Sequence, residues 1–151
     1  MSDNNTLDVT QPPYKGQCLC GGIQFSVDTI GDKMGHCHCS MCRKFHGAAF
    51  ATFGEAKAAH FHWLSGESLL KTYHAPNGTR RKFCSACGSS LIFEEANANG
   101  EIVEFALGVL DTAIPRVPDV HIFVGSKASW YSVEDDLPCF REGRNSPRET
   151  R

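Results

Sequence analysis

The chain has 151 residues, of which 41% are hydrophobic and 21% are charged, and it carries a formal net charge of -2. A chain of this length and composition can bury the core of one domain, and we expect one rather than two. The charge offers no basic excess of the kind that binds phosphate backbones or anionic lipids, so composition favours neither nucleic acid nor a membrane as a partner.

The two ends of the sequence differ in composition from its middle. Residues 1–13 and 141–151 are rich in small polar, charged and proline residues, which predicts flexible tails on either side of a folded domain over residues 14–140. The first ten residues lack the apolar core of a signal peptide, and no run of the sequence has the length of a membrane span. We therefore expect a cytoplasmic protein, in which cysteines seldom form disulfides.

Between these ends, short apolar runs alternate with turn residues. Aromatic and β-branched residues recur at every second position, as in Ile23, Phe25 and Val27, which is the period of a half-buried strand. Gly54 is among the positions at which we expect a turn, and one short helical turn is expected over residues 39–46. The sequence predicts a mainly β fold with strands over residues 23–27, 48–53, 60–64, 69–74, 79–84, 91–94, 102–107 and 120–124.

Seven of the eight cysteines fall into three tight clusters. The clusters are Cys18-Leu19-Cys20, Cys37-His38-Cys39-Ser40-Met41-Cys42 and Cys84-Ser85-Ala86-Cys87-Gly88. Clustered thiolates are typical of zinc sites. One closed tetrahedral site takes four sulfurs and leaves three, which is the ligand count of a zinc that keeps one position open.

The first and third clusters are typical of a closed site. In the third, a tight turn can point Cys84 and Cys87 at one metal, and Gly88 can take the positive φ with which the chain leaves. Buried cysteines that serve only as small apolar residues usually pack singly, so two pairs favour a metal. A zinc ion shared by the two pairs would link distant parts of the chain, but the spacing alone does not say which pairs share a metal.

The middle cluster offers three thiols and only histidines nearby, namely His36, His38 and His46. Cys139 is the other candidate for a fourth ligand, although we interpret it as an ordinary packed thiol. Three thiolates leave a zinc complex with a net charge of -1, which acidifies water less than a three-histidine site does. Such a site is better suited to hold a substrate thiol as its nucleophilic thiolate. An iron–sulfur cluster is less favoured, because it normally takes four cysteines.

Three stretches carry a resemblance to a known family. They are Tyr14-Lys15-Gly16-Gln17-Cys18-Leu19-Cys20-Gly21-Gly22, His36-Cys37-His38-Cys39-Ser40-Met41-Cys42-Arg43-Lys44 and Phe83-Cys84-Ser85-Ala86-Cys87-Gly88-Ser89. Together they resemble the glutathione-dependent formaldehyde-activating enzymes, a family that also includes centromere protein V, over most of residues 14–140. The resemblance implies a Mss4-like β-sheet fold stapled by zinc, with two zinc ions per chain. It places Cys18, Cys20, Cys84 and Cys87 on a structural zinc and Cys37, Cys39 and Cys42 on a catalytic-type zinc.

The reaction that the resemblance implies is the condensation of glutathione with formaldehyde to S-hydroxymethylglutathione, a carbon–sulfur lyase reaction run in reverse. Candidates for binding the thiol substrate flank the middle cluster or lie later in the chain. They are His38, Lys44, His121, Lys127 and Trp130, of which Trp130 is equally a candidate for the core. His60 and His62 are expected to face solvent from a strand.

Two other readings remain open: a zinc-stabilised binding or chaperone-like module without catalysis, and a family member whose middle cluster is only structural. A nucleic-acid role, suggested by the centromere relative, would require a basic stripe. The nearest feature is Arg80-Arg81-Lys82, which we interpret as a solvated strand face. The sequence does not define an oligomeric state.

Overall fold

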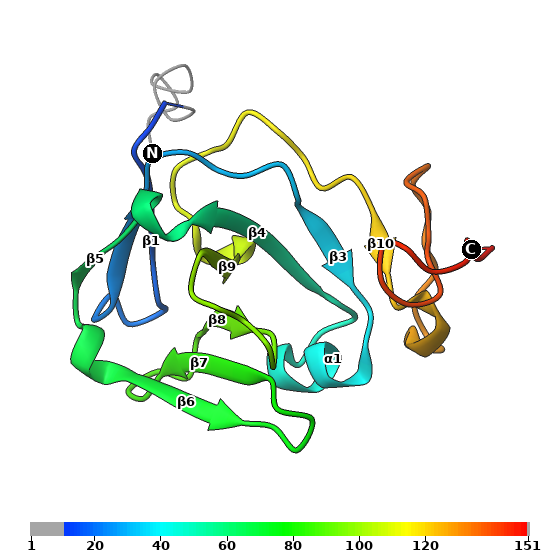
Figure 1. The fold of residues 1–151 in the computed structure, drawn as a ribbon, viewed down its shortest axis with the longest axis horizontal. Helices are drawn as coiled ribbons and strands as arrows, with labels where there is room; N and C mark the ends of the chain where they lie inside the picture. The colour runs from blue at the N-terminus through cyan, green and yellow to red at the C-terminus, as the bar shows by residue number, and fades with distance from the viewer. Residues whose placement is uncertain (1–10, 151) are drawn as a thin grey trace. The chain divides into compact units, whose positions relative to one another are not determined.

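The computed structural model describes residues 11–150, and short β-strands form most of its regular structure (Figure 1). The strands are β1 (Tyr14–Gln17), β2 (Gln24–Val27), β3 (Gly35–Cys37), β4 (Ala51–Lys57), β5 (Phe61–Ser65), β6 (Leu70–His74), β7 (Arg80–Cys84), β8 (Ser90–Glu94), β9 (Ile102–Ala106) and β10 (His121–Ile122). Helix α1 (Ser40–His46) and the 3-10 turns η2 (Ala58–His60), η3 (Glu67–Leu69), η4 (Leu107–Val109) and η5 (Val124–Ser126) complete the list of elements. The prediction of a mainly β fold is confirmed.

The chain forms two compact units, each assembled from segments far apart in the sequence. Of the described residues, the first unit contains 11–32 and 54–117, and the second contains 33–53 and 118–150. Strand β4 starts in the second unit and ends in the first. The domain limits expected from composition stay a prediction.

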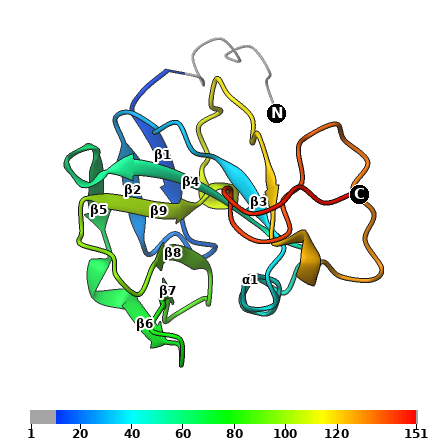
Figure 2. The same ribbon diagram turned by 45° about the vertical axis from the view of Figure 1, so that its right-hand side comes forward.

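The first unit is built on antiparallel strands. β2 pairs with β1 on one side and with β5 on the other, and β7 pairs with β6 and β8 (Figure 2). The core between them is aromatic: Phe25 and Phe105 are almost completely buried, and the Phe25 and Phe61 rings stack at 5.0 Å. This apolar burial stabilises the unit.

A close contact between two glycines shapes the loop after the first cysteine pair. Gly66 has a φ of +75°, and a Cβ there would collide with the carbonyl of Gly22. Only glycine allows both the left-handed backbone and this approach. The contact fixes the loop that follows Cys20.

In the second unit, β3 lies between β10 and the start of β4. β3 pairs in parallel with β10 and antiparallel with the start of β4. Ile122, Cys37 and Ala51 lie opposite one another in one row, and His121, His36 and Thr52 form the adjacent row. Because side chains alternate along a strand, thiol and histidine side chains leave this sheet on opposite faces.

Each predicted strand overlaps an observed one, but several limits were wrong. Gly54 lies inside β4 rather than in a turn, because Phe105 and Leu107 carbons approach to 3.2 Å of where a Cβ would stand. The strand expected over residues 120–124 is only His121–Ile122, because Phe123 has a φ of 58° and turns the chain into η5. Strands β1 and β3 were not predicted, whereas the helical turn was: it is α1.

The predicted tails have different outcomes. Residues 1–10 lie outside the described residues. In the C-terminal segment, the Arg141 N–H donates to the Pro147 carbonyl and the Glu149 N–H donates to the Cys139 carbonyl, each at 2.9 Å. Flexibility of residues 141–151 stays a prediction. No helix within residues 11–150 combines the length and the apolar character that crossing a membrane requires.

Candidate metal centres

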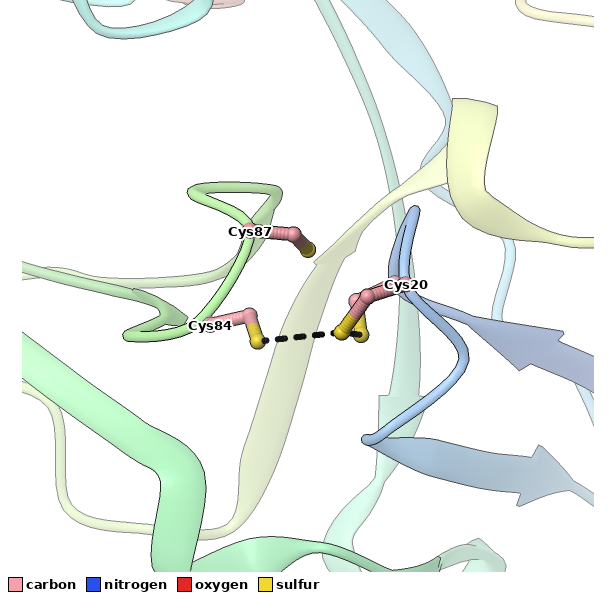
Figure 3. A group of neighbouring side chains, drawn as sticks. Cys20, Cys84 and Cys87 are labelled. Carbon is pink, nitrogen blue, oxygen red and sulfur yellow. Dashed lines mark hydrogen bonds between the residues drawn. The ribbon is translucent and has the colours of Figure 1, made fainter.

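Four thiols meet in the first unit. Cys18 and Cys20 follow β1, Cys84 ends β7, and Cys87 lies in the turn after it. All four sulfurs lie within 4.8 Å of one another. In Figure 3 the side chains of Cys20 and Cys84 point toward each other, and Cys87 comes from the same turn as Cys84. The pairing that the family resemblance implies is the one that the fold brings together.

The sulfur spacing of this four-thiol group fits tetrahedral zinc. A Zn–S bond of about 2.3 Å gives a sulfur–sulfur edge of roughly 3.8 Å in a tetrahedron. The Cys18 and Cys20 sulfurs are 3.6 Å apart, and those of Cys20 and Cys84 are 3.9 Å apart. Both distances are too long for a disulfide, whose S–S bond is about 2.0 Å. The group could hold a metal ion.

Backbone hydrogen bonds hold both cysteine loops in shape. The Gly21 N–H donates to the Cys18 carbonyl at 2.9 Å, and the Gly88 N–H donates to the Cys84 carbonyl at 2.8 Å. Gly88 leaves its turn with a φ of 84°. The Leu19 N–H donates to the Ser89 hydroxyl at 2.8 Å, which joins the two loops.

The thiols of this group ionise unequally. Hydrogen bonding from Ser89 lowers the pKa of Cys87 to about 5. Burial opposes ionisation of Cys18, but the Ile23 N–H at 3.3 Å and the Cys20 and Cys84 thiols lower its pKa. The Gly22 N–H favours ionisation of Cys20, yet Cys18 and the other thiols raise its pKa to about 11. Several thiolates at this spacing repel one another, and a bound cation would remove that penalty.

Three thiols meet in the second unit, at the junction of β3 and α1. Cys37 ends β3, Cys39 is the N-cap of α1, and Cys42 lies in the first turn of the helix. The Cys42 N–H donates to the Cys39 sulfur at 3.2 Å, so capping of the helix orients this thiol. The three sulfurs lie within 4.8 Å of one another, and this three-thiol group could also hold a metal ion.

The surroundings of the three-thiol group are apolar. Cys37 and Cys42 are buried and pack with Ala51, and Phe53, Ile122 and Phe123 cover this cluster. The Cys39 and Cys42 thiols, together with burial, raise the pKa of Cys37. Three thiols in such an environment cannot all ionise without a nearby cation. A soft metal ion bound by the three sulfurs would supply that charge.

Within the described residues, no fourth cysteine, histidine or carboxylate joins this group at the same spacing. Cys139, the alternative ligand, is buried against Val124 and Val133 and belongs to neither thiol group. Its interpretation as a packed thiol agrees with this position. His38 is likewise outside the group.

On the histidine face of β3, a chain of hydrogen bonds runs inward from the surface. The half-exposed Asp135 carboxylate accepts from Nε2 of His121 at 2.9 Å, and Nδ1 of His121 is 2.8 Å from Nε2 of His38. His38 and His121 are fully buried. Burial lowers the pKa of His38 to about 4, so its ring is neutral at pH 7. Sequence reasoning missed Asp135, because no spacing relates it to either histidine.

The candidate substrate-binding residues occupy very different places. His38 and His121 are buried, and Lys44 is exposed on α1. The Lys127 ammonium donates to the Ala128 and Tyr131 carbonyls, so it holds its own loop. Trp130 is 73% exposed and is not a core residue.

The histidines expected on a strand face and the basic tripeptide have mixed outcomes. His62, on β5, is exposed as expected and bonds Asp28 at 2.7 Å, whereas His60 is half-buried and ends η2 rather than lying on a strand. Arg80 and Lys82 both pair with Glu94. Arg81 is only 4% exposed and lies over the Phe93 ring, so the interpretation as a solvated face was wrong for this residue.

Comparison with known protein families gives a match over the part of the chain that carries both thiol groups. Residues 13–126 match the model of the glutathione-dependent formaldehyde-activating enzymes. The chain belongs to this family. The match includes both thiol groups and ends at Ser126, within the segment that follows β10.

Individual relatives are distant. A putative glutathione-dependent formaldehyde-activating enzyme of Halomonas elongata is 29% identical over 128 residues, covering 80% of each chain. An uncharacterised lyase of Schizosaccharomyces pombe is 26% identical over 130 residues, covering 85% of this chain and 91% of the relative. A crystal structure of a Rhodobacter sphaeroides protein has a TM-score of 0.55 at 24% identity and covers 69% of this chain and 97% of that one. That likeness supports the fold alone.

Proposed function

We propose that the protein is a zinc-dependent carbon–sulfur lyase-type enzyme that acts on a thiol adduct and resembles S-(hydroxymethyl)glutathione synthase. The observation that carries the proposal is the three-thiol group, which brings Cys37, Cys39 and Cys42 together with no fourth cysteine, histidine or carboxylate at that spacing in the described part of the chain. A four-coordinate zinc held by these thiols keeps a position for a substrate.

The division of roles follows from the two donor sets. Cys18, Cys20, Cys84 and Cys87 would hold a structural zinc, because four thiolates close a tetrahedron. Cys37, Cys39 and Cys42 would hold the second, catalytic-type zinc. When bound, this second ion supplies the positive charge that keeps an incoming thiol as a thiolate.

The proposed chemistry is an addition that forms one C–S bond and involves no oxidation. The thiol sulfur of glutathione loses its proton and attacks the carbon of formaldehyde, the C=O π electrons move to oxygen, and that oxygen takes up a proton. The product carries a new C–S bond, and the reverse reaction is the lyase direction. The apolar side chains of Phe53, Ile122 and Phe123 would limit the water that competes for this position.

The basic residues of α1, the helix that carries Cys42, support an anionic thiol as the substrate. Lys44 is exposed on α1, and Arg43 on the same helix donates from Nε to the Ser126 carbonyl at 3.2 Å. Glutathione carries two carboxylates, which these cations would attract. We also propose a cytoplasmic location, because glutathione, the proposed substrate, is a thiol of reducing compartments.

The decisive experiment combines metal analysis with thiol binding. Protein purified under reducing, metal-sufficient conditions should contain two zinc ions per chain. Replacing zinc with cobalt should give a visible spectrum that changes when glutathione is added, and Cys39→Ser should abolish that change. Formaldehyde should be consumed faster with the protein than with glutathione alone.

Two outcomes would contradict the proposal. One zinc ion or none would exclude the two-site assignment. Two zinc ions with a cobalt spectrum that no thiol alters would indicate a closed second site, and the protein would then be a zinc-stabilised binding module without catalysis.

A further inference from the structure

Phe123 is exceptional in its backbone conformation. Among the described residues it is the one non-glycine residue with a positive φ, at 58°. A bulky aromatic residue in the left-handed region is a genuine outlier, since its Cβ crowds the neighbouring carbonyl. Such strain persists only where the surroundings impose it, and it concentrates at functional sites.

Hydrogen bonds on both sides of Phe123 impose this conformation. The preceding residue, Ile122, accepts from the His38 N–H at 2.9 Å. The Phe123 N–H donates to the Glu142 carbonyl at 2.8 Å, and its own carbonyl accepts from the Ser126 N–H at 3.0 Å. The backbone around Phe123 therefore has little freedom to relax.

The strained backbone places the Phe123 ring against the three-thiol group. The ring packs on the cluster of Cys37, Cys42 and Ala51 and is itself only partly buried, so it borders both these thiols and the protein surface. The same turn is tied to α1, which carries Cys42, through the bond from Arg43 to the Ser126 carbonyl. Ring and thiol-bearing helix are thus held together by one local framework.

We propose that Phe123 is the gate of the three-thiol site: its ring limits which molecules reach the thiols and disfavours thiols that are bulky next to sulfur. Cysteinyl thiols such as that of glutathione are narrow next to sulfur, whereas tertiary thiols are bulky there. The proposal deepens the function proposed above and rests on it for the identity of the substrate. A ring that serves only as core packing would instead affect stability alone.

The first test measures access to the thiols directly. As-purified protein is treated with iodoacetamide under native conditions, and alkylation of each cysteine is followed by mass spectrometry. Phe123→Ala removes the ring and keeps the strained Cβ, whereas Phe123→Gly removes both. We expect both variants to speed alkylation of Cys37 and Cys42 by about tenfold, since the apolar shell of a metal site governs solvent access.

Controls separate gating from general loosening. Phe140→Ala removes another half-buried ring of the same unit that is not part of the thiol cluster, and it should leave these rates unchanged. Cys18 and Cys84 serve as internal references, because their alkylation should not respond to any of these variants. Phe123→Leu, which keeps an apolar side chain of similar reach, should behave like the wild type.

The second test concerns selectivity. In cobalt-substituted protein, 2-mercaptoethanol should alter the spectrum of the wild type, whereas tert-butyl thiol should do so only in Phe123→Ala and Phe123→Gly. Equal alkylation rates in the wild type and both variants would overturn the gate, whatever the metal content. Faster alkylation in protein that lacks a second metal would support the gate and exclude the proposed zinc chemistry, so the two failures are distinguishable.

Discussion

Replacing Cys84 by serine should unfold the first unit. Cys84 is completely buried at the end of β7, and its sulfur is 3.9 Å from that of Cys20. Structural zinc contributes about 10–16 kcal/mol to the folding of small zinc domains, whereas the net stability of a domain is about 5–15 kcal/mol. A variant that no longer holds the ion therefore loses a contribution as large as the whole net stability, and the unit should be largely unfolded.

The chain offers a matched control for this variant. Cys139 is also buried, but it belongs to neither thiol group, and its sulfur lies 3.6 Å from the Leu137 carbonyl. A serine hydroxyl could still donate to that carbonyl, so Cys139→Ser should cost about 1 kcal/mol. That loss lowers the melting temperature by roughly 2–4 °C in a chain of this size.

Circular dichroism melting and zinc analysis by mass spectrometry distinguish the two variants. Cys84→Ser should lose one zinc ion together with the cooperative transition of its unit, and Cys139→Ser should keep both ions. The reasoning would be refuted by equal melting temperatures, or by a Cys84→Ser protein with unchanged zinc content.

Three further predictions test other parts of the structure. Cys39→Ser should lose the second zinc ion and keep the far-ultraviolet spectrum of the folded chain, which metal analysis and circular dichroism would show. Gly66→Ala should cost about 2–4 kcal/mol in urea unfolding, because its Cβ meets the Gly22 carbonyl, whereas Gly100→Ala, with a similar φ and open space, should cost about 1 kcal/mol. Asp135→Asn should cost about 1 kcal/mol, discounted for the half-exposed carboxylate. The hydrogen bond from His121 lowers the pKa of Asp135, so this difference should persist above pH ~4 and disappear as acid protonates the wild-type carboxylate.

The thiol groups could be predicted because chemistry restricts how cysteines are spaced. Cys84 and Cys87 reach one metal only across a tight turn, and that turn requires a residue such as Gly88 to leave it. The pairing with Cys18 and Cys20 depends on distant segments, and only the family resemblance supplied it. The helical turn over residues 39–46 could be predicted for a similar reason, since its pattern is local.

The histidine chain could not be predicted, because it depends on which strands are neighbours. β3 is Gly35–Cys37, a three-residue strand without β-branched residues, so its pattern gives no signal. Without β3, nothing relates His38 to His121 or to Asp135. The turn predicted at Gly54 was wrong because glycine usually marks a turn. Here Gly54 lies inside β4, and its missing side chain leaves room for the ring of Phe105.

The alternation of side chains along β3 and into His38 explains how the three-thiol group and the histidine chain both begin in this short segment. Cys37 shares its row with Ile122 and Ala51, and its sulfur joins those of Cys39 and Cys42 within an apolar cluster. His38 follows Cys37 immediately, and its side chain contacts His121 on the other face. A substitution at His38 should therefore affect the Asp135 chain before it affects the thiols. The proposed zinc chemistry and the histidine chain are separable by mutation, although a single peptide bond joins the residues that carry them.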